Sequence, residues 1–383
     1  MNSTVLVLGA GIGGLVAANA LRRHLAPRHR VIIANREPVF SLPASYLWVM
    51  SGMRRPREIT RPLDRLVRRG IQWIQGEIEH IDPMRREAVI SGKRIAADYL
   101  VVALGADFDT AKVEGLAGGG LTFTTLDGAT RLNAALSGFR EGRVVILTAA
   151  PLYKCPAAPY EAAMLIEALF RRRGLAGKVS IDLYAAEPGP MGVAGPAVSA
   201  AVRAMVESKG IAYHPERQVV SVDPVRRLID FSNGEKASYD LLAYMPPIKA
   251  PGVARESSLV GESGWVEVDR HTLKTRFANV YALGDAVSIP LAMGKPLPKA
   301  GVFAHAQARV VAHNLVREIN TTGREASYEG NGACFVEEGG GRAGYGAGNF
   351  YAEPKPDVKL RRSGRFWHVG KVWFEKYWFW RWL

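Results

Sequence analysis

The sequence contains little cysteine and no long apolar run. Cys155 and Cys334 are the two cysteines in 383 residues, too few for a disulfide scaffold and in no zinc-binding pattern. No apolar run approaches the roughly 20 residues that a membrane-spanning helix needs, and no secretory segment precedes the first strand-like motif. We therefore expect an intracellular protein without a transmembrane helix. The cysteines can be either small buried hydrophobes or one redox pair.

Acidic residues are outnumbered by basic ones. The chain has 36 Asp and Glu against 50 Lys and Arg, a formal net charge of +14. This charge is compatible with nucleic acid, with an anionic membrane surface, or with a merely basic surface. Hydrophobic residues make up 48% of the chain, and the runs VLVLGAG, YLVVALGA and RVVILTAA are typical of buried parallel strands. The composition predicts an α/β protein of two or three domains rather than a disordered chain.

The first glycine motif predicts a dinucleotide site. STVLVLGAGIGGLVAANALRRHL combines a strand, a glycine turn and a helix, with Gly9, Gly11 and Gly14 at the G-x-G-x-x-G positions. A pyrophosphate bound there would lie at the N-terminus of the helix, where free N–H groups favour an anion. The acidic residue expected after the next strand is replaced by Asn35. Either the Asn35 amide or the nearby Glu37 is the candidate for binding a ribose hydroxyl.

Two further segments are similar to motifs of flavoproteins with two dinucleotide-binding domains. Residues 98–107, DYLVVALGAD, form a strand ending in glycine at Gly105. Residues 277–288, FANVYALGDAVS, end a short strand in Gly284 and Asp285. In those flavoproteins the late Gly-Asp segment binds the ribityl and phosphate part of FAD. The resemblance implies FAD as cofactor and two Rossmann-like domains arranged as in glutathione reductase.

A second phosphate-binding glycine turn is missing. The strand EGRVVILTAAP is followed by LYKCPAAPYEAAMLIEALFRRRG, which leads into a helix. Ala149, Ala150, Pro151 and Leu152 stand where the glycines of an NADH site belong, and proline has no N–H for a phosphate. The second domain therefore keeps a nucleotide-binding architecture in which Cys155 replaces the phosphate site.

The segments YKCPAAPYE and GACFVEEGGG make the chain resemble the sulfide:quinone oxidoreductases and the related flavocytochrome c sulfide dehydrogenases. The resemblance implies that Cys155 and Cys334 lie together beside the flavin. Hydrosulfide would open a disulfide or polysulfide bridge between them, Cys334 would pass electrons to the flavin, and sulfur would grow on Cys155. Lys299 is implied to contact the flavin where negative charge develops, helped by helix N–H groups from Gly301 onward.

Two departures from that family limit what can be carried over. The segment GLTFTTLDGATRL lacks a third cysteine that many members have, which leaves the sulfur product open. PVFSLPASYLW lacks the cysteine through which flavocytochrome-type members attach FAD, so we expect FAD to be bound noncovalently. The neighbouring Lys154 and the start of the following helix predict a lowered thiol pKa for Cys155.

The C-terminal segment is rich in aromatic residues. Residues 366–383, FWHVGKVWFEKYWFWRWL, contain nine aromatic residues, including five of the eight Trp, among basic residues. This pattern favours an interfacial membrane anchor over an ordinary packing helix, because a buried helix rarely has aromatics on every face. By resemblance, Phe374 and Tyr377 border a pocket for membrane quinone. We expect a monotopic protein on the cytoplasmic side and no nucleic-acid binding, since no known module is present.

The predicted organisation has three parts. An FAD domain comprises residues 1–112 and 241–322, a second Rossmann-like domain comprises 113–240, and residues 323–383 carry the second cysteine and the membrane segment. The preferred hypothesis is oxidation of sulfide with a membrane quinone as acceptor. The alternatives are an NADH:quinone oxidoreductase and a non-catalytic membrane-bound flavoprotein that senses redox state. Whether the chain forms a homo-oligomer stays open.

Overall fold

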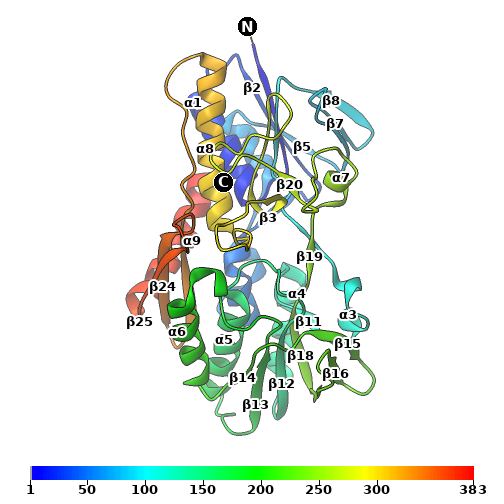
Figure 1. Ribbon diagram of the computed structural model, residues 1–383, viewed down its shortest axis with the longest axis vertical. Helices are drawn as coiled ribbons and strands as arrows, with labels where there is room; N and C mark the ends of the chain where they lie inside the picture. Colours follow the sequence, from blue (N-terminus) through cyan, green and yellow to red (C-terminus); the bar gives the residue numbers. More distant parts are fainter. Residues whose placement is uncertain (1) are drawn as a thin grey trace.

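The computed structural model describes residues 2–383, and its first layer is a parallel sheet (Figure 1). All four neighbouring strand pairs in this sheet run parallel. The predicted VLVLG run forms the central strand, in which the side chains from Val5 to Leu8 are fully buried. The strands in spatial order are β21 (Val280–Ala282), β9 (Tyr99–Val102), β1 (Thr4–Leu8), β2 (Arg30–Asn35) and β5 (Gln72–Gln75).

A second parallel sheet repeats this arrangement in the lower half of Figure 1. The predicted RVVILT run forms its central strand, as the corresponding run does in the first sheet. The two sheets confirm the Rossmann-like α/β fold expected from the sequence. The strands in spatial order are β11 (Leu121–Thr122), β18 (Leu241–Met245), β12 (Gly142–Thr148), β13 (Val179–Tyr184) and β14 (Ala212–His214).

Each parallel sheet is accompanied by an antiparallel meander inserted at the same point of its topology. The first meander precedes β9 and the second precedes β18, and each of these strands lies next to the central strand of its sheet. The two halves therefore share one plan. The meander strands are β6 (Ile78–Asp82), β7 (Glu87–Ile90) and β8 (Lys93–Ala96), then β15 (Val219–Asp223), β16 (Leu228–Phe231) and β17 (Lys236–Ser238).

The chain crosses between the halves twice, at adjacent points. β10 (Asp107–Phe108) leaves the first half and pairs antiparallel with β19 (Ile248–Lys249), which returns to it. β18 pairs with β12 and so belongs to the second sheet. The return to the first half therefore follows Met245, and not residue 241 as expected from the sequence.

Helices cover both sheets. In the first half α1 packs against α8, and in the second half α5 packs on β12 and β13, with α4 at β11 and α6 at β14. Short strands complete the first half, with β3 (Val39–Ser41) pairing with β4 (Thr60–Pro62) and β20 (Val266–Glu267) pairing with β22 (Val287–Ser288). The helices are α1 (Ile12–His24), α2 (Tyr46–Met50), α3 (Leu116–Gly119), α4 (Leu126–Gly138), α5 (Ala158–Arg172), α6 (Pro196–Glu207), α7 (Gly252–Arg255) and α8 (Gly301–Asn320).

The C-terminal part of the chain joins the two halves. A three-stranded antiparallel sheet, β23 (Asn331–Gly339), β24 (Arg342–Asn349) and β25 (Asp357–Gly364), leads into the final helix α9 (Arg365–Trp382). β23 packs against α8 of the first half and α5 of the second (Figure 1). Within residues 2–383, no helix combines the length and apolar character needed to cross a bilayer.

Helix α9 exposes aromatic residues and buries charged ones. Its outer face carries Phe366, Val369, Trp373, Tyr377 and Trp380, of which Phe366 and Trp380 are 75% and 74% exposed. These positions recur every three or four residues and so form one stripe. The inner face packs on the first half, where Trp378 stacks on Phe40 at 4.8 Å between ring centroids, and it also buries Lys371 and Glu375.

Candidate active site

The turn between β1 and α1 has the shape that a bound pyrophosphate requires. Gly9 has a φ of +99°, and a Cβ on Gly14 would lie 1.9 Å from the carbonyl oxygen of Gly9, so both positions need glycine. A Cβ on Gly11 would meet nothing within 4 Å, which leaves space beside the N-terminus of α1 for a phosphate. The side-chain amide oxygen of Asn35 accepts a hydrogen bond from the backbone N–H of Ala10 at 3.0 Å and stabilises the turn.

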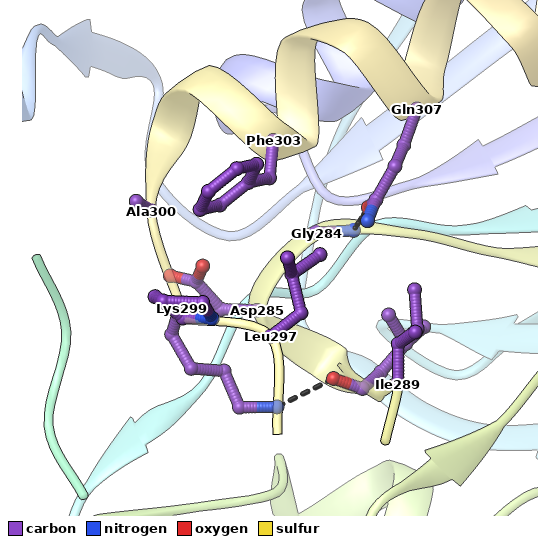
Figure 2. A pocket seen from close by; sticks show the side chains of 10 residues that line it. Gly284, Asp285, Ile289, Leu297, Lys299, Ala300, Phe303 and Gln307 are labelled. Carbon is purple, nitrogen blue, oxygen red and sulfur yellow. Dashed lines mark hydrogen bonds between the residues drawn. The ribbon is translucent and has the colours of Figure 1, made fainter. Parts of the chain in front are cut away.

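The Gly-Asp segment and the start of α8 form a second part of this site (Figure 2). Gly284 has a φ of +73°, and its N–H donates to the Gln307 side chain at 2.7 Å. Gly105, at the end of β9, also has a φ of +73°. α8 begins at Gly301, as expected, so its free N–H groups face the same region. These contacts fit a site for the ribityl and phosphate part of a flavin nucleotide.

Lys299 is a buried cation without a carboxylate partner in the described part of the chain. Its side chain is 3% exposed, its ammonium donates to the backbone oxygen of Val287, and it lies 3.6 Å from the ring centroid of Trp265. Figure 2 shows it reaching away from the start of α8. Burial lowers the pKa of Lys299 to about 7, although Asp285 opposes this shift. A group that gains negative charge would stabilise the charged ammonium, which suits the expected flavin contact.

The Cys155 loop is joined directly to the Lys299 loop. The backbone N–H of Cys155 donates to the carbonyl oxygen of Lys299 at 2.7 Å, next to a bridge between Lys154 and Lys299. Cys155 has a φ of +54°, which is uncommon for a residue with a side chain. The loop that replaces a phosphate turn in the second half thus lies against the flavin site of the first half.

Cys155 and Cys334 line one cavity of about 630 Å³, and both are free thiols. They come from the loop before α5 and from β23, and the chain between them includes the rest of the second half and α8 of the first. Most of the lining is apolar, including Val302, Val336 and Leu360. The structure therefore brings the two predicted cysteines to the same, mostly apolar cavity.

A buried ion network lies beside the thiols. Lys371 of α9 donates to Glu161 of α5 at 3.0 Å, and Glu161 also accepts the backbone N–H of Glu337 at 2.9 Å. His368 contacts both carboxylate oxygens of Glu337 at 3.0 Å. Burial lowers the pKa of Lys371, but Glu161 and Glu337 outweigh it and hold the pKa above its usual value. The network fastens α9 to the wall of the cavity.

The thiol pKa values correct one expectation. Burial, Cys334 and Glu161 raise the pKa of Cys155 well above its ordinary value, and Lys371 and the N–H of Ala158 only partly oppose them. The Lys154 ammonium lies 3.9 Å from Asp285 instead. The prediction that Lys154 and the helix start would lower the pKa of Cys155 was therefore wrong. Burial also raises the pKa of Cys334, to about 12, so both reduced thiols hold their protons at neutral pH.

The second half contains a carboxylate whose oxygens are hydrogen-bonded by other side chains of the protein. Glu187 follows β13 at the edge of the cavity and accepts hydrogen bonds from Tyr153, Tyr160 and, at 2.9 Å, Thr148. Tyr153 and Tyr160 are 6% and 0% exposed. In a dinucleotide-binding domain an acidic residue near this position binds a ribose hydroxyl. Here the Glu187 carboxylate instead accepts hydrogen bonds from Tyr153 of the substituted loop and Tyr160 of the helix that follows it.

The two residues predicted to border a quinone pocket lie in different surroundings. The Phe374 ring lies 6.5 Å from that of Phe335, the neighbour of Cys334. Tyr377 is 39% exposed on the outer face of α9, and its ring stacks on Trp373 at 5.2 Å. The structure therefore places Phe374 beside Phe335, which does not line the thiol cavity, and Tyr377 on the exposed aromatic stripe.

Several residues at the site carry no motif that sequence reasoning could use. Glu161, Glu337 and Lys371 are single charged residues in segments that pattern alone assigns to solvent. The run GACFVEEGG gave one signal, because two acidic residues directly after a strand-like cysteine segment are unusual unless they are paired. Their partners lie far away in sequence and became visible only through the fold.

Comparisons with known proteins agree with this geometry. The sequence model described as pyridine nucleotide-disulphide oxidoreductase matches residues 3–308. A mitochondrial sulfide:quinone oxidoreductase of Mus musculus is 26% identical over 91% of this chain and 79% of its own. A sulfide-quinone reductase of Aquifex aeolicus is 26% identical over 100% of this chain and 91% of its own.

Among solved structures, the sulfide:quinone oxidoreductase of Aquifex aeolicus superposes with a TM-score of 0.90 at 25% identity. The match covers 99% of this chain and 91% of that one, so the likeness includes the C-terminal sheet and helix as well as the two Rossmann-like halves. The chain belongs to the pyridine nucleotide-disulphide oxidoreductase family, and its cofactor is FAD.

Proposed function

We propose that the protein oxidises sulfide and passes the electrons through FAD to a membrane quinone. The observation that carries this proposal is the cavity shared by Cys155 and Cys334, whose wall is hydrogen-bonded to the Lys299 loop of the flavin site. Relatives named for sulfide and quinone that align over most of the chain support the same activity.

The proposed step begins with the two cysteines bridged. Hydrosulfide attacks the sulfur of Cys155, so that a new S–S bond forms there while the bond to Cys334 breaks. The products are a persulfide on Cys155 and a thiolate on Cys334. When bound, FAD supplies the two-electron acceptor that returns the pair to a bridged form longer by one sulfur, with release of one proton.

Residues of this chain prepare that step. The positive charge of Lys371 opposes the rise in the pKa of both thiols and so favours a thiolate during the reaction. The apolar walls exclude water, which strengthens this attraction. The side-chain nitrogen of Lys299 lies where the flavin ring is expected. The phosphates and the ribityl chain are held by Gly9, Gly11, Gly14, Gly284 and Asp285.

We also propose that α9 attaches the protein to the cytoplasmic face of a membrane as a peripheral protein. Its exposed stripe of Phe, Trp and Tyr suits the headgroup level of a bilayer, where such rings prefer to lie. Phe374, which lies near Phe335 of the strand that carries Cys334, is the better candidate of the predicted pair for contact with quinone.

Steady-state turnover tests the proposed donor and acceptor together. We expect the purified holoenzyme to reduce a short-chain ubiquinone with sulfide, and to show no more than background rates with NADH or NADPH. Glu187 is closed by tyrosines and the second glycine turn is missing, so neither nicotinamide cofactor has a site in that half. Fast turnover with NADH and none with sulfide would replace this function with that of an NADH:quinone oxidoreductase.

A further inference from the structure

A second large cavity lies away from the thiols, at the far end of α9. Its volume is about 710 Å³, within the range of ligand sites, and it shares no lining residue with the thiol cavity. Its walls come from α1 and α8 of the first half and from the last turns of α9. No step of the proposed sulfide oxidation uses this cavity, which we call the basic groove.

The charged side chains that line the basic groove are all basic, and none of its lining residues is Asp or Glu. Arg23, Arg309 and Arg381 make no ion pair within 4 Å in the described chain, and they come from three different helices. Arg317 is paired only loosely, at 3.7 Å to Glu325 and 3.9 Å to Glu318, and its buried Nε has no hydrogen-bond partner in the described chain. Three histidines complete the lining, namely His24, His305 and His313.

Such a concentration of like charge attracts an anion to the groove. His305 reports this field, because burial and the nearby Arg309 lower its pKa to about 4. Arg23 and Arg381 share one partner in place of a carboxylate, the Trp382 ring, at 5.9 Å and 5.2 Å. The groove therefore has three guanidinium groups without a carboxylate partner in the described chain, arranged around one space.

The floor of the basic groove is apolar. Ala20, Ala312, Val316 and Trp382 line it, and Trp382 is 6% exposed. Tyr377 lines the same groove, and its ring continues the exposed stripe through Trp373 and Trp380 at centroid distances of 5.2 Å and 5.8 Å. An apolar path thus runs from the cationic groove onto the outer face of α9.

The groove is fixed in shape by hydrogen bonds beneath it. The Asn19 amide of α1 donates to the carbonyl oxygen of Trp382 at 3.1 Å, and Arg69 donates to that of Arg381 at 2.9 Å. These two side chains satisfy carbonyls that the end of a helix leaves free. The last turn of α9 is therefore held in place before any ligand arrives, which reduces the entropic cost of binding.

We propose that the basic groove binds the phosphate headgroup of an anionic phospholipid, whose acyl chains extend along the exposed aromatic stripe of α9. A lipid is favoured over a free phosphate because the groove joins an arginine cluster to an apolar path that opens on the outer face. This inference rests on the proposed membrane attachment and adds the lipid class that the attachment selects.

Vesicle binding by the purified holoenzyme tests the inference. Flotation measures binding to vesicles of phosphatidylcholine alone and to vesicles containing one-fifth phosphatidylglycerol. Three proteins are compared on both kinds of vesicle: the wild type, the variant R23Q/R309Q and the control R172Q/R226Q. The control removes the same charge from exposed arginines of the second half, at the end of α5 and between β15 and β16. We expect phosphatidylglycerol to tighten binding of the wild type and the control at least about tenfold, and R23Q/R309Q to lose most of that gain.

Each other outcome overturns part of the account. Equal losses in R23Q/R309Q and R172Q/R226Q would reduce the effect to net charge and remove the site. Release of the wild type from phosphatidylglycerol vesicles by millimolar inorganic phosphate, but not by sodium chloride of equal ionic strength, would make the groove a free-phosphate site. Failure of the wild type to bind any vesicle would overturn membrane attachment and the lipid site together. Bleaching of the flavin by sulfide needs no vesicle, so it tests the proposed activity separately, and we expect it to be unchanged in R23Q/R309Q.

Discussion

The turn after β1 and the turn after β12 occupy the same place in two sheets of the same strand order, yet they are built for different chemistry. In the first half α1 begins at Ile12, with only Gly9, Ala10 and Gly11 between the strand and the helix. In the second half α5 begins only at Ala158, after a loop that brings Cys155 to the cavity. The first turn offers backbone N–H groups to an anion, and the second offers a buried thiol.

The carboxylates beside the two turns also differ, because the one in the first half is exposed and the one in the second half is enclosed by other side chains. Leu8 pairs with Ala34, and Leu147 pairs with Tyr184, so Glu37 and Glu187 occupy matching positions after their strands. The Glu37 side chain is 64% exposed, and its one ion pair in the described chain is with Arg36. Glu187 is enclosed by Tyr153, Tyr160 and Thr148. The same strand arrangement therefore has an exposed carboxylate in the first half and, in the second half, a carboxylate that is hydrogen-bonded by side chains of the protein itself.

Removing the thiol from the second turn has the largest expected effect. Cys155→Ser and Cys334→Ser each lower sulfide-dependent quinone reduction about 10³-fold or more, because a hydroxyl cannot form the S–S bonds of the proposed step. The bound FAD, measured from its absorbance, stays unchanged, since neither cysteine belongs to the first turn. A sulfide rate within tenfold of the wild type in Cys334→Ser contradicts the cysteine pair.

Filling the first turn tests the opposite side of the comparison. Gly11 has extended backbone angles and open space around its missing Cβ, so Gly11→Val should fold but block the phosphate. We expect FAD affinity to fall about 100-fold, close to 3 kcal/mol, by equilibrium dialysis. The matched change in the second turn, Ala150→Val, should leave FAD affinity intact. Equal losses in both variants would show that the two turns do not differ in this way.

The tyrosine closure of Glu187 contributes to stability rather than to binding. Tyr160→Phe removes a hydroxyl donor from a buried carboxylate, so we expect the free energy of unfolding to fall by about 2 kcal/mol in urea. Tyr239→Phe is the matched control, because that buried hydroxyl has no hydrogen-bond partner in the described chain and its removal should cost little. NADH should still fail to reduce the flavin in Tyr160→Phe, since the loop has no glycine turn.

The raised thiol pKa values predict a pH profile. After reduction, the rate of iodoacetamide labelling should keep rising about tenfold per pH unit above pH 8.5, the ordinary pKa of a free cysteine. It should not level off there, because Cys334 stays protonated until a pH of about 12. A plateau below pH 8 would contradict the electrostatics described for the cavity.

The smallest expected effect concerns the cation beside the thiols. Lys371→Met should slow this labelling about tenfold or less at fixed pH, because loss of the positive charge raises both thiol pKa values further. Lys376→Met, which changes an exposed lysine of the same helix, should not. The variant Lys371→Met/Glu161→Gln avoids leaving an unpaired buried carboxylate and should label at a rate closer to that of the wild type.

Much of the fold could be predicted from the sequence because its signals are local. The runs around Val5, Val101 and Val145 are apolar over whole strands, and the glycine spacing after Leu8 is specific. The missing glycines after Thr148 were equally readable. The expected domain boundary at residue 241 failed because β18 is held in the second sheet by pairing with β12, and sheet partners are not encoded locally.

The candidate site was less predictable, because its electrostatics depend on distant chain segments. Lys154 directly precedes Cys155 in sequence but lies near Asp285, whereas Lys371, far away in sequence, lies beside both thiols. The aromatic composition of the last helix indicated an exposed apolar surface, and the structure shows which face carries it. That the opposite face buries Lys371 and Glu375 could not be read from the segment, since both residues also fit an exposed face.

Anaerobic titration of the bound flavin tests the central claim most directly. With the wild type, we predict that sulfide bleaches the FAD absorbance within the mixing experiment and that NADH does not. With Cys334→Ala, we predict that sulfide leaves the absorbance unchanged. Equal bleaching of the wild type and Cys334→Ala by sulfide, or rapid bleaching of the wild type by NADH, would contradict the account.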